Sequence, residues 1–299
     1  MTTAPDLHRQ VEGVADRELT DSEVAFYQEN GWVFLPQLVS TSVAAEMLRH
    51  LKKVMGMPDD ETRDGDEAAF DRGRVGGRSF HHKHHGFSDY NFAAEEDSYL
   101  ASITYSHEAG RNAQRLMGRN CPVRLWRDSV AVKYPHSSEV ASGKVNWHQD
   151  ANEYPLDRNG SMIFWLALVD MVPEMGTMRF LSRSHCVGGI GFNFYDAEDP
   201  DYVFQQYPLL RRCVVSEPLS YRAGDATVHS GLTCHFSGLN MTDRPRWGYQ
   251  RGYIPGDALY TGEDFKLTRE LGLEVGKELD HPKFPVVCPA ATDGGSGSL

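Results

Sequence analysis

The stretch Asn146-Trp147-His148-Gln149-Asp150-Ala151 places a histidine two residues before a carboxylate. Alternate residues of an extended strand point to the same side, so His148 and Asp150 can reach one metal ion while Gln149 faces away. A complete metal site needs at least one more ligand from elsewhere in the chain.

A second run, His235-Phe236-Ser237-Gly238-Leu239-Asn240, supplies that ligand. In a β-barrel, strands that are distant in sequence become neighbours, so His235 can join His148 and Asp150. Two imidazoles and one carboxylate on one face of the ion, with open positions opposite, are the ligand set of non-haem Fe(II) oxygenases. The three residues therefore predict an iron site.

Arg246 predicts a clamp for an organic acid beside that site. It opens the alternating segment Arg246-Trp247-Gly248-Tyr249-Gln250-Arg251, which is typical of a strand. A guanidinium binds a carboxylate through two parallel, charge-assisted hydrogen bonds.

Two other histidine groups are alternatives. His229 lies on the predicted strand that leads to His235 and is a rival third ligand, although the serine and asparagine that follow His235 favour the later residue. The run His81-His82-Lys83-His84-His85 can itself bind a divalent metal, but its flanking glycines favour a solvated loop or a substrate lid.

The second half of the chain predicts a mainly β fold with flanking helices. Short apolar or alternating segments separated by turn residues are typical of an antiparallel sandwich or barrel. We predict strands at residues 123–133, 162–169, 177–181, 213–215, 226–229 and 246–254. Two facing sheets of four strands, a double-stranded β-helix or jelly roll as in cupins, would bring the candidate ligands and Arg246 together at one mouth.

The first part of the chain, residues 19–118, is predicted to be mainly helical and to pack outside a barrel formed by residues 122–255. Thr20 or Asp21 can cap the first helix, and Gly31 can end it. We predict helices at residues 23–29, 42–55 and 99–117, and a short strand at residues 32–35.

The order of these segments resembles the phytanoyl-CoA dioxygenase family of Fe(II)/2-oxoglutarate-dependent oxygenases. The resemblance runs from Leu19-Thr20-Asp21-Ser22-Glu23 through the Gly224-Asp225 turn to Arg244-Pro245-Arg246. Residues 57–91 have no match, and Met175-Gly176 stands where the family often has an Asn-Gly pair. Neither departure touches the candidate ligands.

The resemblance implies a chemistry for the three ligands. His148, Asp150 and His235 would bind Fe(II), and the reaction would consume 2-oxoglutarate and O2 and release succinate and CO2. Hydroxylation of an unactivated C–H bond is the default outcome. Halogenating members replace the ligand carboxylate with a small residue, so Asp150 argues against halogenation, while desaturation, epoxidation and ring formation remain open.

The resemblance also implies residues for the co-substrate. Arg246 and Ser237 would hold the distal carboxylate of 2-oxoglutarate, and Trp165 would line the same pocket. Lys133, on the strand before the first ligand, is a further candidate.

Two other classes of function are alternatives. One is a cupin-like metalloenzyme, a hydrolase or isomerase, that binds zinc, manganese or nickel and does not use 2-oxoglutarate. The other is a binding module without catalysis. Arg246 and Ser237 favour the oxygenase, because a hydrolase has no need for a guanidinium beside its metal, and three intact ligands argue against a module without chemistry.

Composition limits the partners and the compartment. The 299 residues are 40 % hydrophobic, enough for a sizeable core, and we expect one domain over residues 1–290 with a disordered tail at residues 291–299. A net charge of -12 argues against nucleic acid and anionic membranes as partners. Five scattered cysteines, no signal peptide and no transmembrane stretch predict a reduced, cytoplasmic protein.

The substrate is predicted to be a small organic molecule, free or carrier-bound. Residues 57–91, 188–207 and 256–265 are predicted lids, and their many aromatic side chains favour an apolar or ring-bearing compound. No basic patch suited to a CoA diphosphate stands out, which favours an intermediate of secondary metabolism.

Overall fold

The computed structural model of the protein describes residues 16–56, 81–84, 87–136, 143–191, 199 and 201–291. The predicted tail, apart from residue 291, and most of the predicted lid at residues 57–91 lie outside the described residues. Within the described part of the chain, no helix is both long enough and apolar enough to span a membrane.

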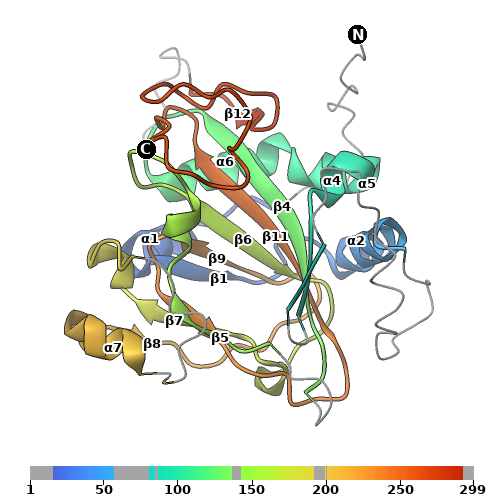
Figure 1. Ribbon diagram of the computed structural model, residues 1–299. Helices are drawn as coiled ribbons and strands as arrows, with labels where there is room; N and C mark the ends of the chain where they lie inside the picture. Colours follow the sequence, from blue (N-terminus) through green and yellow to red (C-terminus); the bar gives the residue numbers. More distant parts are fainter. Residues whose placement is uncertain are drawn as a thin grey trace.

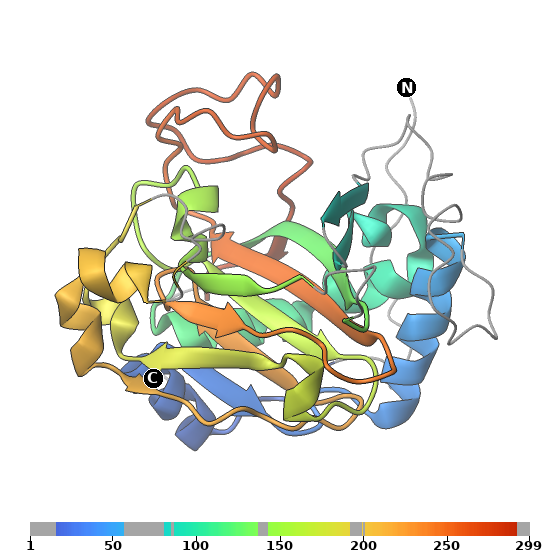
Figure 2. The same cartoon turned by 60° about the horizontal axis from the view of Figure 1, so that its bottom comes forward.

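Two antiparallel sheets face one another (Figures 1 and 2). The larger has the order β1 (Trp32–Leu35), β9 (Ala226–Ser230), β6 (Met162–Ala167), β11 (Arg246–Pro255), β4 (Val123–Lys133), β3 (Phe87–Asn91) and β2 (His81–His84), and β12 (Val286–Cys288) also pairs with β4. The smaller has the order β5 (Val145–His148), β10 (His235–Ser237), β7 (Met178–Ser182) and β8 (Val214–Val215). The predicted mainly β, jelly-roll class is confirmed, and the six predicted strands are correct to within two residues.

The expected division into four plus four strands is wrong, because the larger sheet has eight. β1, β2, β3 and β12 lie outside the predicted barrel region in sequence and add to the edges of its larger sheet. The prediction of a loop for the histidine-rich run is also wrong, because residues 81–84 form strand β2, which pairs with β3. Their side chains and His85 lie outside the described part.

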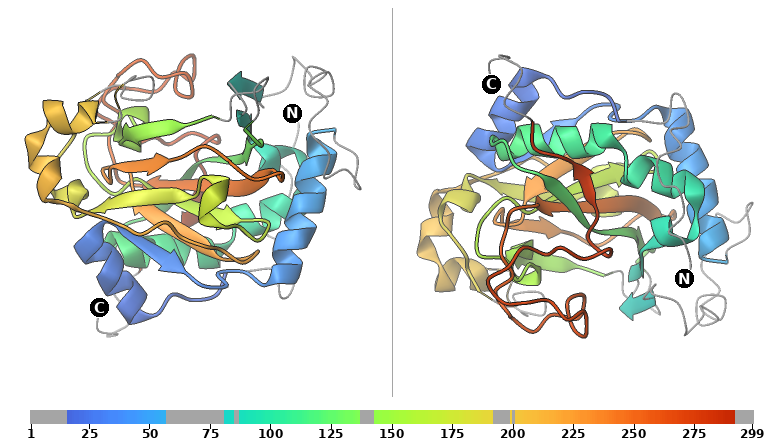
Figure 3. Two further views of the ribbon diagram at one scale, coloured as in Figure 1. Left: turned by 90° about the horizontal axis from the view of Figure 1, so that it is seen from below. Right: turned by 90° about the horizontal axis from the view of Figure 1, so that it is seen from above.

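Helices cover the face of the larger sheet that is turned away from the smaller one, as the two views of Figure 3 show. They are α1 (Asp21–Asn30), α2 (Thr41–Val54), α4 (Ala93–Glu96), α5 (Ser98–Thr104) and α6 (His107–Met117), while α7 (Tyr202–Gln206) lies beside the smaller sheet. Helices on one side and a second sheet on the other bury both faces of the larger sheet.

Local chemistry explains where the helices begin and end. Thr20 and Glu23 form a capping box at the start of α1, and Gly31 ends the helix in the left-handed conformation with φ of 78°. The predicted single helix at residues 99–117 is wrong. It is broken into α5 and α6, because the hydroxyl of Ser106 accepts a hydrogen bond from the backbone of Ala109 and starts a new helix.

Strand β11 divides its residues between two environments. Tyr249, Arg251 and Tyr253 are fully buried on the side of the helices. Arg246 and Gln250 alternate with them and face the smaller sheet, where both line a cavity. Because side chains alternate along the strand, one face of β11 packs in the core under the helices and the other lines the polar cavity between the sheets.

A buried ion pair attaches the amino-terminal segment to the larger sheet. Both Nη atoms of Arg251 donate to the carboxylate of Asp16 at 3.0 Å, and both side chains are 0 % exposed. The guanidinium also lies 5.6 Å from the ring centroid of Phe164. Removing one partner would leave the other charge buried and alone.

We therefore expect Asp16→Asn to lower the free energy of unfolding by about 3–5 kcal/mol. The control is Asp264→Asn, which removes one partner of an ion pair whose side chains are 59 % and 73 % exposed, and should cost less than about 1 kcal/mol. Urea denaturation of both variants measures the difference. Equal losses would contradict a structural role for the buried pair.

Asp128 gives the fold a dependence on pH. Burial raises the pKa of its carboxyl from 3.8 to about 6, against the hydrogen bonds from Tyr249 and the backbone of Ala94. The folded state then binds this proton more tightly than the unfolded state. The contribution to stability is complete below a pH of about 4 and is lost as the pH rises to about 6.

Asp128→Asn keeps an oxygen for Tyr249 but does not titrate. Relative to wild type, the variant should gain stability as the pH rises from about 4 to about 6, by up to roughly 3 kcal/mol, and the gain should stay constant above that range. Chemical denaturation of both proteins across this range is the measurement. A difference that does not change with pH would show that Asp128 is ionised in the folded protein.

Candidate active site

The three candidate ligands meet in the smaller sheet and the turn that follows it. His148 is the last residue of β5, and His235, the first residue of β10, stands directly opposite it in register. Asp150 is not on the strand, as the spacing suggested, but begins the short 3₁₀ helix η1 (Asp150–Glu153). Gln149 between them is still extended, with φ of -118° and ψ of 141°, so His148 and Asp150 point to the same side.

Gln149 faces away from this cluster, as predicted. Its amide Nε2 donates to the carbonyls of Gly188 and Leu232, and its Oε1 accepts from the backbone of Ile190. It therefore ties two loops to the strand that ends at His148.

The geometry of the cluster suits a divalent metal. One nitrogen each of His148 and His235 and one oxygen of Asp150 lie within 4.8 Å of one another, and all three residues are buried. The closest approaches are 3.3 Å from His148 Nε2 to Asp150 Oδ1 and 3.8 Å from His235 Nε2 to Asp150 Oδ2.

Backbone carbonyls fix the tautomers of both imidazoles. Nδ1 of His148 donates to the carbonyl of Asn146 at 2.7 Å, and Nδ1 of His235 donates to the carbonyl of Thr233 at 3.1 Å. Each Nε2 therefore turns a lone pair toward the cluster, as in metal-binding histidines whose other ring nitrogen donates to a carbonyl or carboxylate oxygen.

Electrostatics favour the protonation states that a metal needs. Burial and the neighbouring His148 hold the pKa of His235 well below its usual range, so the ring is neutral. Burial opposes ionisation of Asp150, but the surrounding histidines outweigh it and hold the pKa of the carboxyl well below its usual range. Neutral imidazoles and a carboxylate are the forms that ligate a metal.

A cavity of about 200 Å³ extends from this cluster to Arg246. Trp165, Met178 and Ser237 line it between the two. The guanidinium of Arg246 lies 5.2 Å from the ring centroid of Trp165, and Nη1 donates to the carbonyl of Gly176. Arg246 is 2 % exposed, and its Nε has no hydrogen-bond partner among the described residues.

Lys133 stands opposite Arg246 in the pairing of β4 with β11. It does not line the cavity itself but reaches it through Ser237, because Nζ donates to Ser237 Oγ at 2.7 Å and to the carbonyl of Gly238 at 2.6 Å. Burial and the nearby guanidinium hold the pKa of Lys133 well below its usual range. In the described part of the chain neither cation has a carboxylate partner, so this end of the cavity fits the carboxylate of an organic acid.

Beyond the candidate site residues and His229, the cavity is lined by residues that the motifs did not point to: Arg127, Val145, Glu153, Ile163 and Gln250. Strand periodicity carried a signal for two of them. Arg127 is six residues before Lys133 on β4, and Gln250 is four residues after Arg246 on β11, so each pair shares a face. His229 was weighed as a rival ligand, and the structure places its Nε2 2.9 Å from Oδ2 of Asp150.

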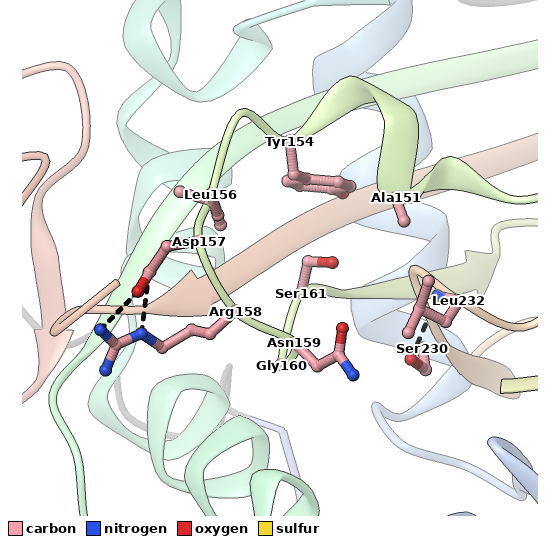
Figure 4. Close-up of a pocket in the computed structure, with 10 residues that line it drawn as sticks. All are labelled: Ala151, Tyr154, Leu156, Asp157, Arg158, Asn159, Gly160, Ser161, Ser230 and Leu232. Atoms are coloured by element: carbon pink, nitrogen blue, oxygen red, sulfur yellow. Dashed lines mark hydrogen bonds and ion pairs between the residues drawn. The ribbon is translucent and has the colours of Figure 1, made fainter. Parts of the chain in front are cut away.

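A second, smaller cavity of about 130 Å³ lies beside the same turn (Figure 4). Ala151 of η1 and Tyr154 line it together with Asn159 and Ser161, whereas Asp150 and Glu153 of the same turn line the larger one. No candidate ligand and no co-substrate residue borders this smaller cavity, so it is not the candidate active site.

The fold and the site together define a class: a double-stranded β-helix with a His, Asp, His cluster between its sheets and a buried basic end for an organic acid. A sequence model of the phytanoyl-CoA dioxygenase (PhyH) family matches residues 27–248. The chain belongs to this family. It is therefore a 2-oxoglutarate-dependent dioxygenase, an oxidoreductase that uses Fe(II), 2-oxoglutarate and O2.

Individual proteins agree with this assignment. The methylphosphonate hydroxylase of Gimesia maris is 24 % identical over 82 % of this chain and 83 % of that protein. The α-ketoglutarate-dependent carbocyclase SnoK from nogalamycin biosynthesis has a TM-score of 0.68 at 23 % identity, covering 90 % of this chain and 96 % of that one. The epimerase SnoN, solved with Fe3+, α-ketoglutarate and nogalamycin RO, has a TM-score of 0.69 at 23 % identity, covering 89 % and 98 %. At this identity the two solved structures establish the fold.

Family membership decides between the classes weighed from the sequence. It favours the oxygenase over a cupin-like hydrolase or isomerase and over a module without catalysis.

Proposed function

We propose that this enzyme hydroxylates an unactivated C–H bond of a small organic substrate, an intermediate in the biosynthesis of a natural product. The iron would be held by His148, Asp150 and His235. Fe(II) with 2-oxoglutarate and O2 supplies the oxidising power, and succinate and CO2 are released. The observation that carries the proposal is the buried, incompletely paired Arg246 at the far end of the cavity from these three residues.

The chain's own residues have separate tasks in this reaction. Arg246 binds the distal carboxylate of 2-oxoglutarate, and Ser237, held by Lys133, adds a hydroxyl. Trp165 packs against the guanidinium and excludes water from it. These contacts orient the co-substrate so that its other end points to the three ligands.

Relatives support the type of reaction and substrate. One curated relative is named a hydroxylase, and two similar solved structures are enzymes of nogalamycin biosynthesis. Asp150 keeps the ligand carboxylate that a halogenating member would lack. The five cysteines are free, which supports the proposed location in the reducing cytoplasm.

The substrate would enter past the least buried part of the cavity. The side chains of Arg127 and Glu153 are 17 % and 30 % exposed and form an ion pair at 2.8 Å. Val145 and Gln250 are also half-buried, while the other lining residues are buried. Because the cavity is smaller than the roughly 300–1,000 Å³ of most ligand sites, part of the substrate would lie at this mouth.

The co-substrate assignment is tested with Arg246→Ala. Loss of a buried charged partner should weaken 2-oxoglutarate binding by about 2–5 kcal/mol, at least roughly thirtyfold, while iron stays bound. The measurement is the weak visible charge-transfer band that forms when anaerobic protein is mixed with Fe(II) and 2-oxoglutarate. Wild type should show the band and His235→Ala should not, and Asp150→Ala should have no turnover.

The opposite result has a clear meaning. If wild type binds iron but gives no band with 2-oxoglutarate, the co-substrate does not chelate the metal here and the proposed reaction fails. If Arg246→Ala keeps full affinity, another cation binds the acid.

The proposed entry of the substrate beside Arg127 is tested with Arg127→Leu. The charge-transfer band should persist, but substrate-dependent release of succinate should fall roughly tenfold, equivalent to about 1.4 kcal/mol. Arg158→Leu is a matched control, because Arg158 is also paired with a neighbouring carboxylate, Asp157, but lines the smaller cavity. Each variant is incubated with a library of candidate substrates, and the succinate released is measured by mass spectrometry. If succinate release falls equally in both variants, Arg127 has no specific part in substrate recognition.

A further inference from the structure

His229 contacts the cluster of candidate ligands from the opposite sheet. It lies on β9 of the larger sheet, in register with Ile163 on one side and Trp32 on the other. Its side chain is 2 % exposed, and its Nε2 lies 2.9 Å from Oδ2 of Asp150. The candidate ligands belong to the smaller sheet and the turn after it, so this contact joins the two sheets across the site.

Chemistry fixes the direction of the hydrogen bond. A carboxylate only accepts, so Nε2 of His229 carries the hydrogen and donates it to Asp150. Nδ1 of the ring is buried and has no hydrogen-bond partner among the described residues. Within that part of the chain, the bond to Asp150 is therefore the one hydrogen bond of the His229 ring. A nitrogen that donates to Asp150 has no lone pair for a metal ion. The rival role of His229 as a third ligand is therefore not favoured by this geometry.

The two oxygens of Asp150 have different neighbours. Oδ2 accepts from His229 and lies 3.8 Å from Nε2 of His235, whereas Oδ1 lies closer to a candidate ligand nitrogen, 3.3 Å from Nε2 of His148, whose lone pair faces the cluster. The ring of His229 is held in place by packing, with its centroid 5.6 Å from that of Phe180. Rotation of the carboxylate would break the His229 bond and leave buried polar atoms unpaired.

We propose that His229 is a positioning residue that holds Oδ2 of Asp150, so that Oδ1 alone is presented to the iron. The proposal rests on the proposed function, because it takes Asp150 as a ligand. A carboxylate that offers one oxygen leaves more coordination positions to the organic acid than one that offers two. Outer-shell hydrogen bonds of this kind orient ligands and strengthen metal binding.

The test separates the hydrogen bond from the packing of the ring. Gln at position 229 places an amide N–H near the place of Nε2, Asn places one near Nδ1, and Leu has no donor. His229→Leu and His229→Asn should weaken Mn(II) binding by about 10–100-fold, while His229→Gln should restore it to within about threefold of wild type. Free Mn(II) is measured by EPR in a titration of the whole protein without 2-oxoglutarate, and thermal melting checks that each variant is folded.

Phe180→Leu is the control for packing, because it alters the neighbour of the ring and leaves the hydrogen bond in place. Its affinity for Mn(II) should stay within about threefold of wild type. The charge-transfer band with Fe(II) and 2-oxoglutarate gives a second readout: it should be weak in His229→Leu and restored in His229→Gln.

Two results would overturn the proposal. If His229→Leu binds Mn(II) as tightly as wild type, His229 only fills space. If His229→Gln loses the metal as completely as His235→Ala, His229 is itself a ligand. Failure of the proposed function is a different result, in which wild type binds Mn(II) but gives no charge-transfer band with Fe(II) and 2-oxoglutarate.

Discussion

The candidate site depends on the register in which β10 pairs with β5. His235 stands opposite His148, and the next residue but one, Ser237, lies on the same face. A shift by one residue would turn both side chains to the other side of the sheet, away from the cavity. The same short strand therefore places one candidate metal ligand and one proposed co-substrate residue together, and it is paired along both edges, with β5 on one side and β7 on the other.

The interior between the sheets is polarised along the cavity. At one end a single carboxylate, Asp150, is surrounded by imidazoles, and at the other two cations, Lys133 and Arg246, lie side by side. A metal ion would add positive charge at the first end, and an organic acid would add negative charge at the second. Binding of both would complete the pairing of buried groups and stabilise the folded state through linkage. On the other face of the larger sheet, an apolar core and the Asp16–Arg251 pair lie under the helices.

Much of the fold and site was predictable because its signals are local. The capping box at Thr20, the left-handed Gly31 and the period of two in β4 and β11 depend on residues close in sequence. The break of the predicted third helix at Ser106 was missed because a serine cap competes with a continuous helical pattern. The eight strands of the larger sheet were missed because β12 and the hairpin of β2 and β3 are short additions to edges, which only their partner strands define.

The sequence by itself determined the residue types and spacings of the chemistry: the histidine and carboxylate of the first motif, the later histidine with its serine, and the arginine beyond them. It did so because each motif is a short run with its own periodicity. Only the tertiary structure decided which partner each group has. It placed His229 on the carboxylate of Asp150, put Lys133 behind Ser237, and brought Arg127 and Glu153 to the mouth of the cavity. These pairings join residues from strands and turns far apart in the chain, and they exist only when the two sheets face one another.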